Sequence, residues 1–177
     1  MTATIKPRVL VVMGVSGSGK TSIAESLRDR LGWVFQEGDQ LHSRENVAKM
    51  SAGIPLTDED RWPWLDDCAK WIQARIDAHE GGLLTCSALK RVYRERLGEG
   101  NPGLCFLYLK VSEGVLQVRL GQRRGHYMPP SLLPSQLRAL EEPTSDEPAL
   151  TVPVERTVDE TVSDVLAALQ RLDASEA

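Results

Sequence analysis

Eight residues near the start of the chain have the composition of a phosphate-binding loop. The segment "GVSGSGKT", residues 14–21, matches the pattern G-x-x-x-x-G-K-[ST] in full. Its glycines permit backbone angles that turn successive N–H groups toward one point, where phosphate oxygens can approach closely. Lys20 can neutralise charge on the β- and γ-phosphates of a nucleotide, and the Thr21 hydroxyl can ligate Mg²⁺. The residues expected to hold the nucleotide are therefore Gly14, Ser16, Gly17, Ser18, Gly19, Lys20 and Thr21.

This loop alone leaves three classes of protein open: GTPase switches, ATP-driven machines and small-molecule kinases. A GTPase should have a D-x-x-G segment after a later strand and an N-K-x-D segment, and we find neither. A helicase-like or transporter-like ATPase should have an apolar run that ends in an acid, whereas the third expected strand leads into "TCSALK". A small-molecule kinase needs an acceptor pocket and a mobile lid that carries arginine, and the sequence has candidates for both.

The segment "GDQLH" is the candidate for the acceptor side. Asp39 follows the second expected strand directly, so in a parallel sheet it should face the same crevice as the phosphate loop. An aspartate there can hydrogen-bond an acceptor hydroxyl and take its proton, and His42 can bind another hydroxyl. The alternatives are a helix N-cap for Asp39 and a surface position in the first turn of a helix for His42.

Three cations near the ends of strands are candidates to bind an anionic part of the acceptor. Arg61 lies in "DEDRWPWL", and Lys90 and Arg94 lie four residues apart in "CSALKRVYR". Arginine can grip a carboxylate through two parallel hydrogen bonds. The alternative is that these cations are ion-pair partners of Glu37, Glu95 or Asp58. Together, the residues favour a hydroxylated, anionic small molecule as the acceptor.

The candidate lid is "RLGQRRGHYMPPSLL", residues 119–133, which carries Arg119, Arg123 and Arg124. Arginines that close over a transferring phosphoryl group stabilise its charge and exclude water. The alternative is a solvated basic end of a helix, where cations interact favourably with the helix dipole.

Short apolar runs alternate with helical patterns along the chain, which predicts βαβ units and a mainly parallel sheet. Pro153 lies in the last apolar run, residues 150–156, which suits a strand at the edge of the sheet. Pro63 must lie in the first turn of its helix or bend it, so that helix should begin within "TDEDR". The expected strands are residues 8–13, 33–38, 82–87, 104–111 and 150–156. The expected helices include the segments around residues 23–31, 64–76, 134–140 and 158–172.

Composition places the chain among ordinary soluble proteins. With 41% hydrophobic and 26% charged residues over 177 positions, one domain covering residues 1–177 is expected. A net charge of −4 argues against general nucleic-acid binding or attachment to an anionic membrane. The first apolar run is too short for a secretory signal or a membrane span. Three cysteines without metal-type spacing indicate reduced thiols in a cytoplasmic protein.

Four segments, taken in order, resemble the successive signature blocks of the gluconate kinases. These segments are "GVSGSGKT", "EGDQLHSRENVAKMSAGIPLTDEDRWPWL", "CSALKRVYRERL" and "RRGHYMPPSLLPSQLRALEEP", within a match from about residue 9 to residue 143. The resemblance implies a three-layer α/β/α P-loop kinase fold, similar to shikimate and adenylate kinases. Its five-stranded parallel sheet would have the order 2-3-1-4-5, with a mobile lid over about residues 119–135. The implied reaction is ATP plus D-gluconate giving ADP plus 6-phosphogluconate, with Mg²⁺.

The same resemblance implies roles for individual residues. Asp39 would contact the acceptor hydroxyl, and the cations Arg61, Lys90 and Arg94 would face the carboxylate or the transferred phosphate. The lid would contain Arg119, Arg123 and His126, with one arginine near the adenine and one near the reacting phosphoryl group. Arg123 is the catalytic candidate, and which arginine takes which place stays open. Gln136 would order the segment behind the lid.

Three positions depart from the family pattern or vary within it. Tyr127 and Leu137 stand where Phe is common in the family, a change that affects the packing of the lid more than the chemistry. At position 37, Glu replaces an equally acceptable Asp, which would slightly change its reach to a Mg²⁺-bound water. Two other functions stay open at this point: a kinase of another small hydroxy acid such as shikimate, and a nucleotide-binding regulator without turnover. The oligomeric state also stays open. Relatives are often dimers, but this sequence has no exposed apolar stripe that requires a homodimer.

Overall fold

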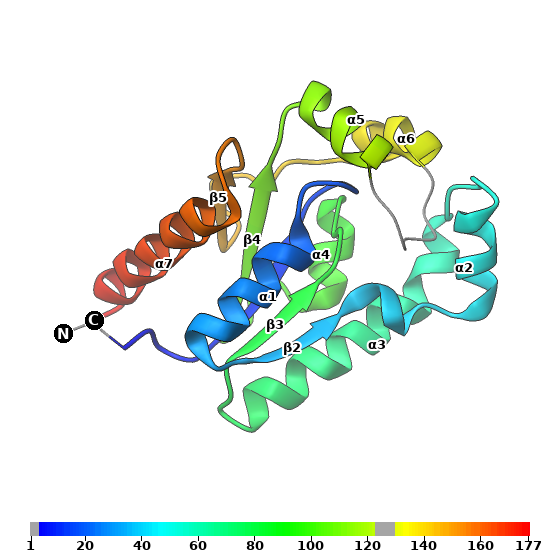
Figure 1. Cartoon of the computed structure of the whole chain (residues 1–177). Helices are drawn as coiled ribbons and strands as arrows, with labels where there is room; N and C mark the ends of the chain where they lie inside the picture. Colours follow the sequence, from blue (N-terminus) through cyan, green and yellow to red (C-terminus); the bar gives the residue numbers. More distant parts are fainter. Residues whose placement is uncertain (1–3, 123–129) are drawn as a thin grey trace.

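The computed structural model describes residues 4–122 and 130–177, which form alternating strands and helices (Figure 1). The strands are β1 (Val9–Met13), β2 (Val34–Glu37), β3 (Gly82–Thr85), β4 (Leu104–Lys110) and β5 (Ala149–Pro153). The α-helices are α1 (Lys20–Leu31), α2 (Arg44–Ser51), α3 (Asp58–Asp77), α4 (Arg91–Leu97), α5 (Glu113–Gln122), α6 (Leu133–Ala139) and α7 (Val158–Ser175). Two short 3₁₀ helices, η1 (Gly38–Leu41) and η2 (Pro130–Leu132), complete the elements that the structure describes.

The five strands form one parallel sheet in the order β2-β3-β1-β4-β5, as the family resemblance implied. The register places Thr85 of β3 between Glu37 of β2 and Val12 of β1. All five expected strands are confirmed, with shifts of no more than three residues at their ends. Pro153 lies on β5 at the edge of the sheet, where its missing N–H removes no bond from a central ladder.

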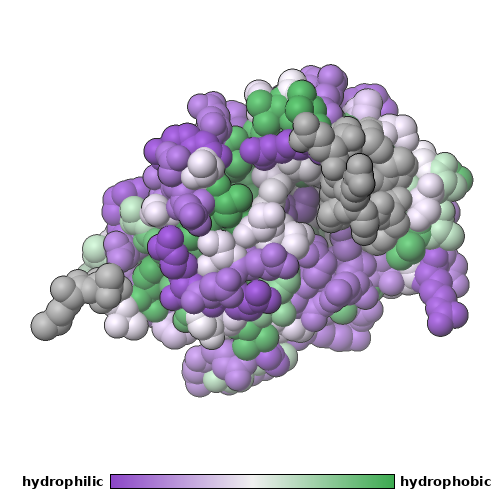
Figure 2. All heavy atoms as spheres, in the orientation of Figure 1, coloured by the Kyte–Doolittle hydropathy of each residue, from purple (hydrophilic) through white to green (hydrophobic). Residues whose placement is uncertain are grey.

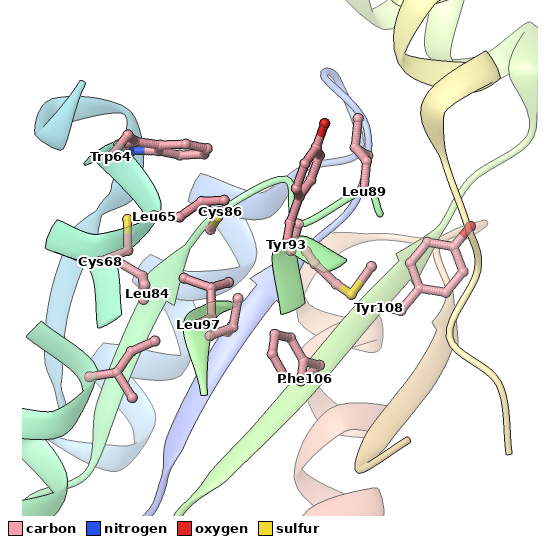
Figure 3. Close-up of a cluster of buried hydrophobic side chains, with 14 of the residues drawn as sticks. Trp64, Leu65, Cys68, Leu84, Cys86, Leu89, Tyr93, Leu97, Phe106 and Tyr108 are labelled. Atoms are coloured by element: carbon pink, nitrogen blue, oxygen red, sulfur yellow. The ribbon is translucent and has the colours of Figure 1, made fainter. Parts of the chain in front are cut away.

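Helices cover both faces of the sheet and make it the middle of three layers. On one face, α3 and α4 pack on the side chains of alternate strand residues such as Leu84 and Phe106, and Figure 3 shows this cluster with Trp64, Leu65 and Cys68 of α3. On the other face, α1 and α7 pack on the intervening residues such as Leu83 and Leu107. Because every central strand is buried on both sides, its residues are apolar without alternation.

The chain enters α3 through a capping box, which explains where this helix begins. The Thr57 hydroxyl accepts a hydrogen bond from the Asp60 N–H, and the Asp60 carboxylate accepts one from the Thr57 N–H. The start within "TDEDR" is therefore confirmed, whereas Pro63 lies beyond the first turn, inside the helix. Among the described residues no helix is long and apolar enough to cross a membrane.

Arg94 is buried in the interior, whereas the sequence pattern predicted that it would bind an anionic part of the acceptor near the strand ends. Its side chain is 1% exposed, and its guanidinium donates to both Glu147 carboxylate oxygens at 2.6 and 3.2 Å. It also donates to the carbonyls of Ala88 and Leu89 at 2.8 and 3.2 Å. These bonds tie α4 to the loop before β5, so Arg94 has a structural environment here and does not face an acceptor.

We predict that Arg94→Leu lowers the free energy of unfolding by about 3–5 kcal/mol, because it leaves the Glu147 carboxylate buried without its partner. Urea unfolding followed by circular dichroism measures this change. The control is Arg96→Leu, which removes an ion pair with Asp66 on the surface and should change stability far less. Equal midpoints for the Arg94 variant and the parent protein would show that the buried pair is not a determinant of stability.

Candidate active site

The predicted phosphate loop joins β1 to α1, which is the context that the motif requires. Gly14, Gly17 and Gly19 have φ angles of 147°, 84° and 95°, which L side chains rarely adopt. At Gly14 a Cβ atom would also come within 2.8 Å of the Ser18 hydroxyl oxygen. Gly19 is the N-cap of α1 and offers no side-chain cap, so the first N–H groups of this helix remain available to an anion.

Lys20 lies across this loop. Its ammonium group donates to the Gly14 carbonyl at 3.0 Å and to the Val15 carbonyl at 3.1 Å. These hydrogen bonds hold the positive charge beside the amides that would surround a phosphate. The position fits the charge-neutralising role that the motif predicts.

The carboxylate of Glu37, at the end of β2, connects three parts of the site. One oxygen accepts a hydrogen bond from the Thr21 hydroxyl at 2.8 Å, and the other accepts one from the Thr85 hydroxyl at 2.6 Å. Thr85 in turn accepts the Gly38 N–H at 3.1 Å. Thr21 and Glu37 are among the residues considered from the sequence, whereas Thr85, the last residue of β3, is not; its place near the carboxyl end of an expected strand was the available signal.

Mg²⁺ prefers hard oxygen ligands and keeps several waters, so one or two protein groups beside a nucleotide phosphate suffice to hold it. The Thr21 hydroxyl and the Glu37 carboxylate are donors of this kind, and they are already in contact. In the described ranges no group of three or more His, Cys, Asp or Glu residues forms a dedicated metal cluster. The donor set therefore fits a magnesium ion that arrives with a nucleotide.

Gln136 of α6 contacts the phosphate loop through its side chain. Its side-chain oxygen accepts a hydrogen bond from the Ser16 N–H at 2.6 Å, and both residues are buried. The chain between α5 and α6 contains the expected lid, so this bond links the base of that segment to the phosphate loop. The role of Gln136 was expected only from family resemblance and only in general terms.

Asp39 lies on η1, and His42 follows this short helix directly. A Cβ atom at Gly38 would come within 1.9 Å of the Thr85 carbonyl oxygen, so only glycine allows β2 to turn this closely past β3. The Trp64 indole N–H donates to the Gly38 carbonyl at 2.8 Å and fixes the turn from the other side. Neither alternative is found: the N-caps of η1 and α2 are Glu37 and Ser43, and His42 is partly buried.

The His42 ring stacks on Trp64 with 3.9 Å between centroids and 19° between planes. Burial, and to a lesser extent the positive charge of Arg61, lower the pKa of His42 to about 4. The imidazole is therefore neutral near pH 7.

Arg61 is held at the junction of two cavities. Its guanidinium donates to the Leu56 carbonyl and lies 5.2 Å from the centre of the Tyr93 ring. Because Tyr93 also hydrogen-bonds Asp58 at 2.5 Å, the aromatic ring below Arg61 is itself anchored. A planar cation fixed in this way suits recognition of a carboxylate or phosphate.

A cavity of about 250 Å³ brings most of these groups together, and we call it the P-loop cavity. Its lining includes Lys20 and Thr21 on one wall and Asp39, His42 and Arg61 on the other. Figure 2 shows the hollow on this face of the molecule, bordered by pale, weakly polar residues and by hydrophilic ones. Nucleotide-side and acceptor-side candidates thus share one space.

Lys90 borders a neighbouring cavity of about 340 Å³, which we call the Tyr93 cavity and which shares Arg61 with the first. Its ammonium group lies 3.3 Å from an Asp58 carboxylate oxygen, which is one of the ion pairs considered as an alternative. Lys90 is the N-cap of α4, so it does not share a helical face with buried Arg94. The structure therefore separates the two cations that the sequence pattern paired.

Of the expected lid residues, Arg119 belongs to the described part of the chain. It lies on α5, lines the P-loop cavity, and is 3.5 Å from the Ser18 carbonyl oxygen. Arg123, His126 and Tyr127 lie outside the described residues. Leu137, the other departure from the family pattern, is partly buried against the α3–α4 core.

No protein-family model matches the chain. The chain is 52% identical over 169 residues to a gluconokinase of Gluconobacter oxydans, which covers 96% of this chain and 95% of the relative. A crystal structure of a gluconokinase from Sinorhizobium meliloti superposes with a TM-score of 0.83 at 47% identity, over 95% of this chain and 94% of that one. A crystal structure of a sugar kinase from a Janibacter species gives a TM-score of 0.86 at 48% identity, over 93% and 95%. This chain belongs to the gluconokinase family.

Proposed function

We propose that the protein transfers the γ-phosphoryl group of ATP to the terminal hydroxyl of D-gluconate, giving ADP and 6-phosphogluconate. The observation that carries this proposal is the P-loop cavity, in which Lys20 and Thr21 face Asp39, His42 and Arg61 across one space. The acceptor oxygen would form the new bond to phosphorus as the bond to the ADP oxygen breaks. The three buried, free cysteines support a cytoplasmic location for this reaction.

The nucleotide end of the reaction is assigned to the loop and its neighbours. The amides of residues 19–21, at the N-terminus of α1, would surround the β-phosphate, and Lys20 would exchange its carbonyl contacts for phosphate oxygens. Arg119 of α5, which lines the same cavity, would contact the phosphates or the adenine. Thr21 directly, and Glu37 through a bound water, would hold Mg²⁺, which when bound neutralises charge on the phosphates.

The acceptor end is assigned to the opposite wall. Asp39 would orient the terminal hydroxyl of gluconate and accept its proton as the oxygen attacks. His42 would bind a second oxygen of the acceptor. Arg61 stands between the two cavities and Lys90 lines the second, so the carboxylate of gluconate would lie toward them. By family resemblance, Arg123 and His126 would close over the substrates from the lid.

We predict selective turnover of gluconate when ADP release from ATP and Mg²⁺ is measured with a panel of acceptors. The panel contains gluconate, shikimate, other aldonates, glucose and nucleoside monophosphates. Glucose lacks the carboxylate that Arg61 and Lys90 would bind, so its kcat/KM should be lower by at least about tenfold. Preference for shikimate or a nucleotide would overturn the assignment of the acceptor wall. ATP binding without turnover of any acceptor would indicate a regulator.

We predict that Asp39→Asn lowers kcat by about 10²–10⁴, the usual contribution of a positioned proton acceptor. The amide keeps the shape of the side chain, so ATP binding and the thermal unfolding temperature should change little. The control is Asp29→Asn, the same substitution at an exposed position of α1, and it should leave kcat unchanged. Near-normal turnover by the Asp39 variant would exclude a role in deprotonation.

We predict that Gln136→Leu raises KM for ATP by about fivefold or more, because the loss of a buried hydrogen bond costs about 1 kcal/mol or more. The substitution removes the oxygen that holds the Ser16 N–H, so the phosphate loop should lose its fixed shape. The control is Gln73→Leu, which removes an exposed hydrogen bond on α3. Steady-state kinetics with ATP varied would contradict this role if both variants gave the parent value.

A further inference from the structure

His42 is held on a fixed aromatic surface at the acceptor wall. The Trp64 side chain below it is buried and is anchored through its indole N–H to the Gly38 carbonyl. With 3.9 Å between ring centroids, the imidazole can turn little without losing this contact. The orientation of the two ring nitrogens is therefore decided by what contacts the ring edge.

One ring nitrogen of His42 meets Asn46, a buried residue of α2. The Asn46 side-chain nitrogen lies 3.3 Å from His42 Nδ1 and 2.9 Å from the main-chain carbonyl oxygen of Asp60. A carbonyl oxygen can only accept a hydrogen bond, so the atom of the Asn46 amide that faces the Asp60 carbonyl must be the nitrogen and not the oxygen. The amide nitrogen has two hydrogens and can donate to both neighbours. Nδ1 of His42 must then be the acceptor and carry no proton.

A neutral imidazole without a proton on Nδ1 carries it on Nε2. Among the described residues Nε2 of His42 has no hydrogen-bond partner, and the ring lines the P-loop cavity. The positive charge of Arg61 lowers the pKa of His42. The other charged residues that line the same cavity are Lys20, Glu37, Asp39 and Arg119. The ring thus presents a neutral N–H donor on the wall where Asp39 presents an acceptor.

We propose that Asn46 is a positioning residue that holds His42 in the Nε2–H tautomer, so that His42 donates a hydrogen bond to an oxygen of the acceptor. Asp39 and His42 together then present one acceptor and one donor, which matches neighbouring hydroxyl groups of a polyhydroxy acid. The tautomer follows from the contacts alone, and only the identity of the bound oxygen rests on the proposed function.

The tautomer is measured without any substrate by long-range ¹H–¹⁵N correlation spectra of the labelled protein. The chain has three histidines, and the His42 signals are identified by their loss in His42→Ala. We expect the Nε2–H pattern for His42 at pH 7. An Nδ1–H pattern would overturn the proposal, whatever the enzyme does with gluconate.

The variant Asn46→Asp replaces the donor to Nδ1 by a carboxylate. We expect His42 to gain a proton on Nδ1 and its pKa to rise, since a negative charge now lies beside the ring. The KM for gluconate should rise by about tenfold, as expected for one lost or misdirected hydrogen bond, with little change in KM for ATP. The matched control is Asn101→Asp, the same substitution in the turn before β4, which should change neither the His42 spectrum nor KM.

The outcomes separate this inference from the proposed function. If Asn46→Asp changes the tautomer but leaves KM for gluconate unchanged, the donor from His42 plays no part in binding and the proposal fails. If the parent protein turns over another acceptor and not gluconate, the proposed function fails, while the spectra still decide the tautomer. An equal rise of KM for ATP and gluconate would indicate a general disturbance of the cavity and would also overturn the specific role.

Discussion

Glu37, Thr85 and Val12 lie side by side on β2, β3 and β1, and this register determines what the site can contain. It brings the end of β2 against the first turn of α1, so that one carboxylate reaches both the Thr21 and Thr85 hydroxyls. A shift of β2 by one residue would turn Glu37 to the other face of the sheet. The hydrogen bond from Trp64 and the tight approach at Gly38 hold this end of β2 in place, and the acceptor wall begins there.

Much of this arrangement could be predicted from the sequence because its signals are local. The phosphate loop has a fixed spacing, the strands are short apolar runs, and the capping residues of α3 lie three positions apart. Asp39 could be placed because it follows a strand directly, and parallel strands end at one edge of the sheet. The sheet order was a different matter, since it came from the family resemblance and not from any pattern along the chain.

Contacts between distant residues could not be predicted in the same way. The cationic side chain of Arg94 looks like a ligand for an anion until Glu147, 53 residues later, is brought against it. Asn46 meets the Asp60 carbonyl, and Gln136 meets the Ser16 N–H, through main-chain groups that carry no sequence signal. Residue type alone therefore shows that a group can be charged or polar, whereas its partner decides whether it binds a ligand or stabilises the fold.

The position of Pro153 on β5 has a consequence for how two copies of the chain can meet. The next N–H, that of Val154, points inward to the Lys110 carbonyl of β4, so the nitrogen of Pro153 faces the outer edge of the sheet. Because proline has no N–H, an added strand would receive no hydrogen bond from position 153. At the other edge of the sheet, β2 is only four residues long and offers little backbone for pairing. Edge-to-edge strand addition, a common route to aggregation, is therefore disfavoured at both edges of the sheet.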